Sequence, residues 1–213
     1  MAFNKNVFIN CPFDEDYLPL LRPLLFTVIF LGFKPRISLE NLDSGSPRIQ
    51  KITRLIASSK YGIHDLSRLR ASRAGEYYRL NMPFELGVDV GCRLFGTPLQ
   101  KTKQCLVLEK ERYRYQAAIS DLSNSDIATH EGAPEIILTQ VRNWLDTQAK
   151  LRAPGPAMVW VAFLDFMADN LRDLKQRGFS DRDIENLPIS ELMSCIERWV
   201  ALNAPRAAAN RRP

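Results

Sequence analysis

The sequence has few of the residues that build metal centres or disulfide frameworks. Its 213 residues include four cysteines and two histidines. These are Cys11, Cys92, Cys105 and Cys195, with His64 and His130. No two cysteines form a CxxC pair, so the sequence predicts no metal site. It shows no signal peptide either, and we expect four free thiols in the reducing cytoplasm.

Long hydrophobic runs are also missing. The longest, Leu24 to Phe33, is interrupted by Thr27 and follows Arg22 and Pro23. It falls well short of the ~20 apolar residues that a helix needs to cross a bilayer. This run predicts a buried helix, and we expect no membrane partner.

The positive charge is too dispersed to indicate a nucleic-acid surface. The formal net charge is +5, but Arg206, Arg211 and Arg212 lie in the last ten residues. Elsewhere basic and acidic residues are interleaved, and no run of five like charges occurs. We therefore do not expect nucleic-acid binding.

Three common functional motifs are also absent from the sequence. It contains no glycine-rich dinucleotide fingerprint, no Walker A loop and no GxSxG elbow, so it does not predict a Rossmann dinucleotide-binding protein, a P-loop NTPase or an α/β-hydrolase.

Short apolar segments alternate with helical patterns over the first 150 residues. The predicted strands cover 6–12, 33–39, 61–67, 103–109 and 126–130. The predicted helices cover 18–32, a segment starting at Pro47 after the cap Ser46, 82–95, and a segment starting at Pro134. This alternation predicts an α/β domain over residues 1–151, with a parallel sheet of about five strands and helices on both faces. The connection 68–79 is predicted to be mobile.

A Pro/Gly-rich segment, 152–157, marks a predicted boundary. Beyond it, two apolar stripes at helical spacing predict a helical hairpin over 156–203. We expect the hairpin to pack on the sheet domain or to form an interface with another copy or a partner protein. The Ala- and Arg-rich tail, 204–213, is predicted to be disordered.

Candidate site residues follow from the strand positions. Ligands of open parallel sheets bind outside the carboxyl ends of the strands. Polar groups stand there after the first and third predicted strands and at the start of the helix before the fourth. The candidates are Asn10, Cys11, Pro12, Phe13, Asp14, Arg48, His64, Asp65, Asn81 and Glu85.

Each candidate also has a structural interpretation. With Met82 as N-cap, Glu85 occupies the first turn, where the helix dipole favours a carboxylate and keeps it ionised. Asp65 is compatible with a turn at a strand end, His64 with a structural histidine, and Arg48 with a solvated helix face. Cys11 is either an ordinary free thiol or a thiol of low pKa in the first loop. The residues alone leave these alternatives open.

Three segments carry a resemblance to a known superfamily. VFINCPFDEDY, IHDLS and NMPFELG resemble the proteins that join nucleoside 2-deoxyribosyltransferases with TIR domains. The resemblance spans roughly residues 5 to 150 and implies a flavodoxin-like sheet. In the deoxyribosyltransferases the glutamate of Glu-Leu-Gly is the nucleophile, and TIR enzymes require a comparable glutamate to cleave NAD. This implies a catalytic role for Glu85 and, at the end of the third strand, for Asp65.

The function implied is an N-glycosidase that cleaves the ribosyl–base bond of NAD or a related nucleotide. NAD would be a substrate, and no cofactor is expected. Glu85 would capture or stabilise the oxocarbenium-like centre, Asp65 would hold the ribose, and residues 10–14 would close the pocket. Bacterial domains of this kind resemble antiphage defence effectors that act on assembly. The alternatives are a non-catalytic TIR-like interaction module and a nucleotide sensor.

Overall fold

The structure is a computed structural model that describes residues 2–40, 45, 47–68, 80–112 and 126–203. The predicted disordered tail, nearly all of the predicted mobile connection and the predicted cap Ser46 lie outside the described residues. Within them, no helix has the length and apolar character needed to cross a membrane.

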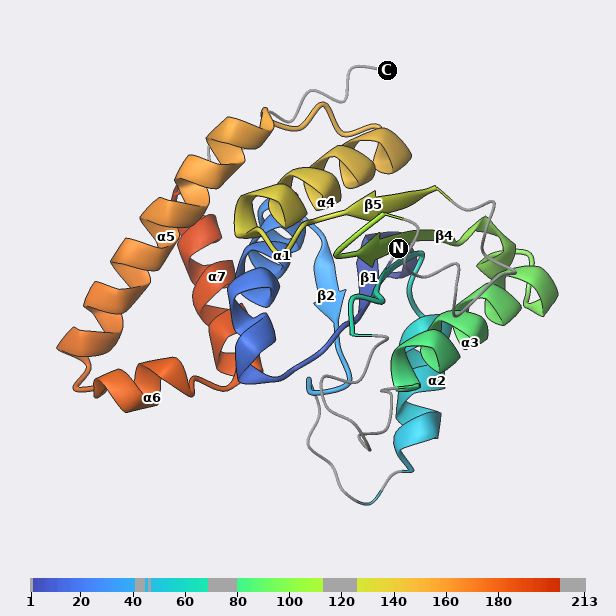
Figure 1. Ribbon diagram of the computed structural model, residues 1–213, viewed down its shortest axis with the longest axis horizontal. Helices are drawn as coiled ribbons and strands as arrows, with labels where there is room; N and C mark the ends of the chain where they lie inside the picture. The colour runs from blue at the N-terminus through green and yellow to red at the C-terminus, as the bar shows by residue number, and fades with distance from the viewer. Residues whose placement is uncertain (1, 41–44, 46, 69–79, 113–125, 204–213) are drawn as a thin grey trace.

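A five-stranded parallel sheet forms the centre of the protein (Figure 1). Its strands are β1 (Asn6–Asn10), β2 (Lys34–Arg36), β3 (Tyr61–Asp65), β4 (Gln104–Glu109) and β5 (Ile127–Thr129). They are hydrogen-bonded in the order β2-β1-β3-β4-β5, and all neighbours are parallel. This is the flavodoxin-like order, so the predicted fold class is confirmed. The strands are shorter than predicted; β1, for example, ends two residues before Pro12.

Helices cover both faces of the sheet (Figure 1). The four that do so are α1 (Leu18–Phe30), α2 (Arg48–Ala57), α3 (Asn81–Phe95) and α4 (Pro134–Ala149). Successive side chains of a strand point to opposite faces. Val7 and Ile9 of β1 accordingly pack in the core of α1 and α4, whereas Phe8 packs against α2. Short 3-10 helices at Phe3–Lys5, Glu15–Tyr17 and Gln100–Thr102 complete this part.

The C-terminal helices cover the outer side of α1. They are α5 (Pro156–Gln176), α6 (Asp181–Glu185) and α7 (Ile189–Asn203). The predicted hairpin thus has a short helix in its connection, and it packs on the sheet domain. The Phe26 ring of α1 lies 5.5 Å from Phe163, 5.6 Å from Phe166 and 5.8 Å from Trp199, measured between ring centroids. Helix α1 is therefore enclosed by the sheet on one side and by α5 and α7 on the other, which explains its apolar residues on nearly all sides.

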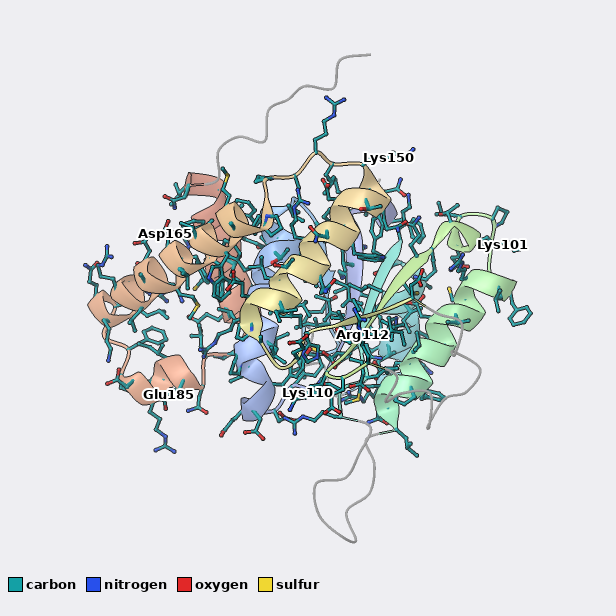
Figure 2. All side chains as sticks on the ribbon, turned by 45° about the horizontal axis from the view of Figure 1, so that its top comes forward. Lys101, Lys110, Arg112, Lys150, Asp165 and Glu185 are labelled. Atoms are coloured by element: carbon teal, nitrogen blue, oxygen red, sulfur yellow. The ribbon has the colours of Figure 1, made fainter. Side chains whose placement is uncertain are left out.

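Several charged side chains lie on the outer surface of the helices. Lys150, Asp165 and Glu185 are exposed and project from the outer surface of the helices (Figure 2). The C-terminal helices and the sheet share one continuous hydrophobic core.

This shared core leads to a prediction for Phe26. Phe26→Ala should lower the free energy of unfolding by about 3–5 kcal/mol, because it leaves a cavity where α1, α5 and α7 meet. Urea unfolding followed by tryptophan fluorescence measures the loss. The matched control is Phe95→Ala, which removes a ring that is 87% exposed and should change stability by no more than about 0.5 kcal/mol. Similar losses in both variants would contradict a shared core centred on Phe26.

Candidate functional site

A cleft of about 480 Å³ opens at the carboxyl end of β1 and the beginning of α3. It lies beside the boundary of β1 and β3, where the strand order reverses and where flavodoxin-like folds bind ligands. The lining residues are Asn10, Cys11, Phe13, Asp14, Arg48, Asn81, Met82 and Glu85. All but Met82 are among the candidates predicted from the sequence. Three other candidates, Pro12, His64 and Asp65, are buried and do not line the cleft.

Glu85 occupies a different helical position from the predicted one. Helix α3 begins at Asn81 with Leu80 as N-cap, so Glu85 is the fifth helical residue and the first turn holds no acidic residue. The prediction of Met82 as N-cap is wrong by two residues. Glu85 is 6% exposed, and its carboxylate accepts no hydrogen bond from the residues that the structure describes. It is a largely buried acid without a structural partner in this part of the chain.

The charge of Glu85 depends on Arg48. Burial raises the pKa of Glu85, and the positive charge of Arg48 partly opposes this rise. The predicted stabilisation of the ionised Glu85 carboxylate by a helix N-terminus is therefore not found. Burial instead makes ionisation of this carboxylate less favourable. Arg48 lies at the first position of α2 and lines the same cleft, so the cleft pairs a buried acid with a cation.

Cys11 is a protonated thiol. Burial raises the pKa of Cys11 well above its ordinary value, and the negative charges of Asp65, Glu85 and Asp14 raise it further. The hypothesis of a thiol with low pKa is therefore wrong. Cys11 therefore contributes a neutral thiol to the cleft.

Asp65 lies beneath the cleft, with no exposed surface. Its Oδ1 accepts a hydrogen bond from the backbone N–H of Ser67 at 2.8 Å, and its Oδ2 accepts one from the hydroxyl of Tyr17. The Oδ2 atom also lies 3.1 Å from Nε2 of His130. The backbone N–H of Gly132 donates to Nδ1 of His130 at 3.0 Å, so the neutral ring carries its proton on Nε2, facing Asp65.

These partners explain both the charge and the placement of Asp65. Burial opposes its ionisation, but His130, Ser67 and Tyr17 together hold the pKa of Asp65 below its usual range. Tyr17 in turn donates its backbone N–H to Oδ1 of Asp14 at 3.1 Å. The direct contact with a ribose expected for Asp65 is thus replaced by a supporting role under the loop 10–14.

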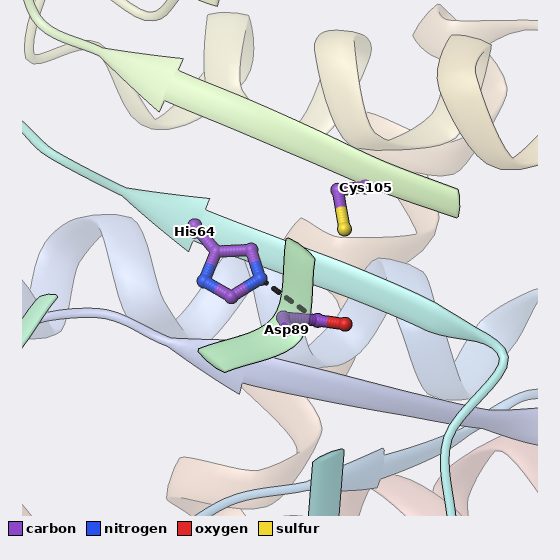
Figure 3. A group of neighbouring side chains, drawn as sticks. All are labelled: His64, Asp89 and Cys105. Atoms are coloured by element: carbon purple, nitrogen blue, oxygen red, sulfur yellow. Dashed lines mark hydrogen bonds and ion pairs between the residues drawn. The ribbon is translucent and has the colours of Figure 1, made fainter. Parts of the chain in front are cut away.

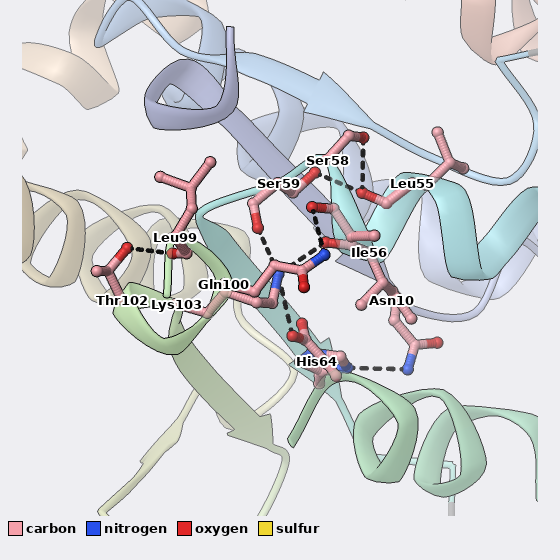
Figure 4. A network of polar contacts seen from close by, with 12 residues as sticks. Asn10, Leu55, Ile56, Ser58, Ser59, His64, Leu99, Gln100, Thr102 and Lys103 are labelled. Atoms are coloured by element: carbon pink, nitrogen blue, oxygen red, sulfur yellow. Dashed lines mark hydrogen bonds and ion pairs between the residues drawn. The ribbon is translucent and has the colours of Figure 1, made fainter. Parts of the chain in front are cut away.

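His64 points to the opposite face of β3 and belongs to a second buried network. The Nδ2 of Asn10 lies 3.1 Å from Nδ1 of His64 (Figure 4). The Nε2 of His64 lies 3.0 Å from Oδ2 of Asp89 (Figure 3). The Oδ1 of Asp89 forms an ion pair of 3.1 Å with Nζ of Lys103. These four residues, the buried polar chain, run from the cleft into the interior between α2 and α3.

One cluster in this network has the composition of a metal site. Ligand atoms of His64, Asp89 and Cys105 lie within 4.8 Å of one another (Figure 3). The ammonium of Lys103 already supplies the positive charge to Asp89. Burial and Asp89 raise the pKa of Cys105, which therefore remains a thiol and not a thiolate ligand. Both features disfavour a cation at this cluster.

Sequence reasoning did not identify Tyr17, Asp89, Lys103 or His130 as part of the site. A lysine before a strand and an aspartate within a helix are typical of exposed positions, yet Lys103 is 1% exposed and Asp89 is fully buried. The one signal was spacing, because Asp89 follows Glu85 by four residues and so lies on the same face of α3.

Comparison of the chain with protein-family models, with curated proteins and with solved structures finds no match. Fold and cleft together define the class: a flavodoxin-like α/β protein with a polar cleft at the switch point of its sheet.

Gly62 gives a test of the buried polar chain. A Cβ at this position would overlap Oδ2 of Asp89 and lie 2.8 Å from Nε2 of His64. Gly62→Ala should therefore lower the free energy of unfolding by about 1–3 kcal/mol. Gly87→Ala is the control, because a Cβ there meets nothing within 4 Å and should stabilise α3 by about 0.5–1 kcal/mol. Urea unfolding of both variants measures the difference, and a stable Gly62→Ala protein would contradict the packing described.

Proposed function

We propose that the protein is an N-glycosidase that cleaves the ribosyl–base bond of NAD or a related nucleotide. The observation that carries this proposal is the position of Glu85. Its carboxylate is largely buried, accepts no hydrogen bond from the described residues and lines a polar cleft at the switch point of the sheet. A group of this kind is available for a reacting atom, whereas a structural carboxylate is hydrogen-bonded, as Asp65 is.

The other cleft residues suit the parts of a nucleotide. The guanidinium of Arg48 offers a site for a phosphate. The amides of Asn10 and Asn81 are of the kind that binds ribose hydroxyls, and Phe13 offers a ring for stacking with a base. Apolar and charged groups thus stand in one cleft, as in other small-molecule sites.

The proposed reaction is a substitution at C1′ of the ribose. The bond from C1′ to the base nitrogen breaks, and its electron pair leaves with the base. The carboxylate of Glu85 captures or stabilises the oxocarbenium-like centre. Water then attacks C1′ and gives up one proton to solvent, which leaves a hydroxyl on C1′ of the ribosyl product and restores the carboxylate. Nicotinamide is a pyridinium in NAD and leaves as a neutral molecule, so this step needs no general acid. A purine would need a proton at its departure, which favours NAD as the substrate.

An exposed apolar stripe supports a second function as an interaction module. Met158, Val161, Leu164 and Leu171 of α5 are each 48–60% exposed and recur at helical spacing. Such a surface suits assembly with another copy or a partner protein. Together with the resemblance to TIR domains, it extends the proposal to an antiphage defence effector whose activity depends on assembly.

The first test is Glu85→Gln. The variant keeps the shape of the side chain but removes the charge, so nicotinamide release from NAD should fall by at least about 100-fold. The assay uses high protein concentration, in case assembly is required, and circular dichroism confirms the fold. Glu15→Gln, which removes an exposed carboxylate, is the control and should remain active. Equal activity of the Glu85→Gln variant would contradict the catalytic role, and wild-type protein that releases neither nicotinamide nor base would support the interaction module.

The second test is the pH dependence of cleavage. Only ionised Glu85 can act, so kcat/KM should fall as the pH drops through its pKa, which burial places above the ordinary glutamate value of 4.5. Arg48→Gln removes the charge that lowers this pKa, and the acid limb should move to higher pH. Arg54→Gln, on an exposed turn of α2, should leave the limb in place. If Arg48→Gln does not move the acid limb of the pH profile, the group that titrates is not Glu85.

A further inference from the structure

The buried polar chain begins at Lys103, whose ammonium makes three polar contacts. The ammonium of Lys103 donates to the carbonyl oxygen of Ile56 at 2.8 Å and to that of Ser59, and it lies 3.1 Å from Oδ1 of Asp89. Two hydrogen bonds to backbone carbonyl oxygens and one ion pair with Asp89 thus hold the ammonium in place. Lys103 is therefore a fixed positive charge in the interior.

This charge determines the proton position on His64. Burial opposes the ionisation of Asp89, but His64 and Lys103 hold the pKa of Asp89 below its usual range. An ionised carboxylate only accepts hydrogen bonds, so Nε2 of His64 donates to Oδ2 of Asp89 over 3.0 Å. In the neutral ring the other nitrogen, Nδ1, is then an acceptor. It receives the amide of Asn10.

The acceptor on His64 in turn fixes the amide of Asn10. Its Nδ2 donates to Nδ1 of His64 at 3.1 Å and to the carbonyl oxygen of Met82 at 2.8 Å. Both partners only accept, so both amide protons are used and the amide cannot be reversed. The oxygen of Asn10 points away from His64 (Figure 4), and no described residue donates to it. Asn10 lines the cleft, which therefore contains an acceptor of fixed direction without a protein donor among the described residues.

We propose that Asn10 recognises a ribose hydroxyl of the ligand and that His64, Asp89 and Lys103 are positioning residues that hold its amide oxygen toward that hydroxyl. A fixed acceptor favours hydroxyl donors and disfavours phosphate oxygens, which are left to Arg48. The identity of the ligand as a ribonucleotide rests on the proposed function. The direction of the amide rests on the buried polar chain alone.

Asp89→Asn tests the buried polar chain, because this substitution should reverse the donor and acceptor roles along the chain. The new amide must give its oxygen to the ammonium of Lys103, so its NH₂ group faces Nε2 of His64. The ring proton then moves to Nδ1 and opposes the NH₂ group of Asn10. In the double variant Asp89→Asn/Lys103→Met the ammonium is gone, the oxygen of the new amide can accept from Nε2, and the original tautomer returns.

The tautomer is read from long-range ¹H–¹⁵N correlation spectra of the imidazole nitrogens. The chain has two histidines, and His130 serves as an internal reference because Gly132 fixes its proton on Nε2. We expect His64 protonated on Nε2 in the wild type, on Nδ1 in Asp89→Asn, and on Nε2 again in the double variant. Any other wild-type state, or a double variant that does not recover, overturns the positioning role. The double variant leaves no unpaired buried charge, so the comparison with wild type stands even where Asp89→Asn fails to fold.

The hydroxyl contact is tested by calorimetric binding to the Glu85→Gln protein, which should not consume the ligand. The probes are NAD and its analogues that lack the 2′- or the 3′-hydroxyl of the nicotinamide ribose. One analogue should bind about tenfold more weakly than NAD. Asn10→Ala should remove this discrimination, and the double variant should keep it. Arg54→Gln, at an exposed position of α2 outside the cleft, is the control and should keep it as well.

The outcomes separate this inference from the proposed function. Binding of NAD with discrimination that Asn10→Ala leaves unchanged overturns the role of Asn10 but leaves cleavage by Glu85 in place. Discrimination that depends on Asn10 in a protein whose wild type releases no nicotinamide supports the recognition site and overturns the glycosidase. No binding of NAD overturns the recognition by Asn10, and the release of nicotinamide or base by the wild type then decides the proposed function.

Discussion

The arrangement of the cleft residues depends on the ion pair between Lys103 and Asp89. Two charges removed from water are costly to bury unless they are paired and hydrogen-bonded. Here the ammonium also binds the carbonyl oxygens of Ile56 and Ser59, at the C-terminal end of α2, where the helix dipole favours a cation. A single side chain thereby joins the start of β4, the end of α2 and the middle of α3. Arg48 and Glu85 lie on those two helices, so their separation across the cleft follows from this contact.

Strand β3 contributes residues to a polar network on each face of the sheet. His64 and Asp65 are neighbours in the sequence, and the pleat directs them to opposite sides. His64 connects to Asp89 and Asn10 beneath α3, while Asp65 connects to Tyr17 and His130 beneath the loop 10–14. The cleft is thus supported by two separate polar networks, whereas the carboxylate of Glu85 accepts no hydrogen bond from the described residues.

Much of the fold and most of the cleft could be predicted because they depend on local patterns. Alternating apolar strands and helices predicted the parallel sheet, and the carboxyl ends of parallel strands necessarily share one edge. That rule, together with the helix N-termini that lie at the same edge, places Asn10, Asp14 and Glu85 together. The buried partners could not be found in this way, since Lys103 and Asp89 have the sequence environment of exposed residues. Their burial comes from packing between segments far apart in the chain. The role expected for Asp65 changed for the same reason, because Tyr17 and His130 occupy its oxygens.

The enclosure of α1 has a consequence for the order in which the protein is made. Its inner face meets the sheet, but the outer face around Phe26 is covered by α5 and α7. These helices leave the ribosome after every strand of the sheet has been synthesised. Until then a phenylalanine-rich surface is open to water, of the kind that promotes aggregation of partly folded chains. The sheet can therefore form during translation, whereas closure of the core must wait until α7 has emerged.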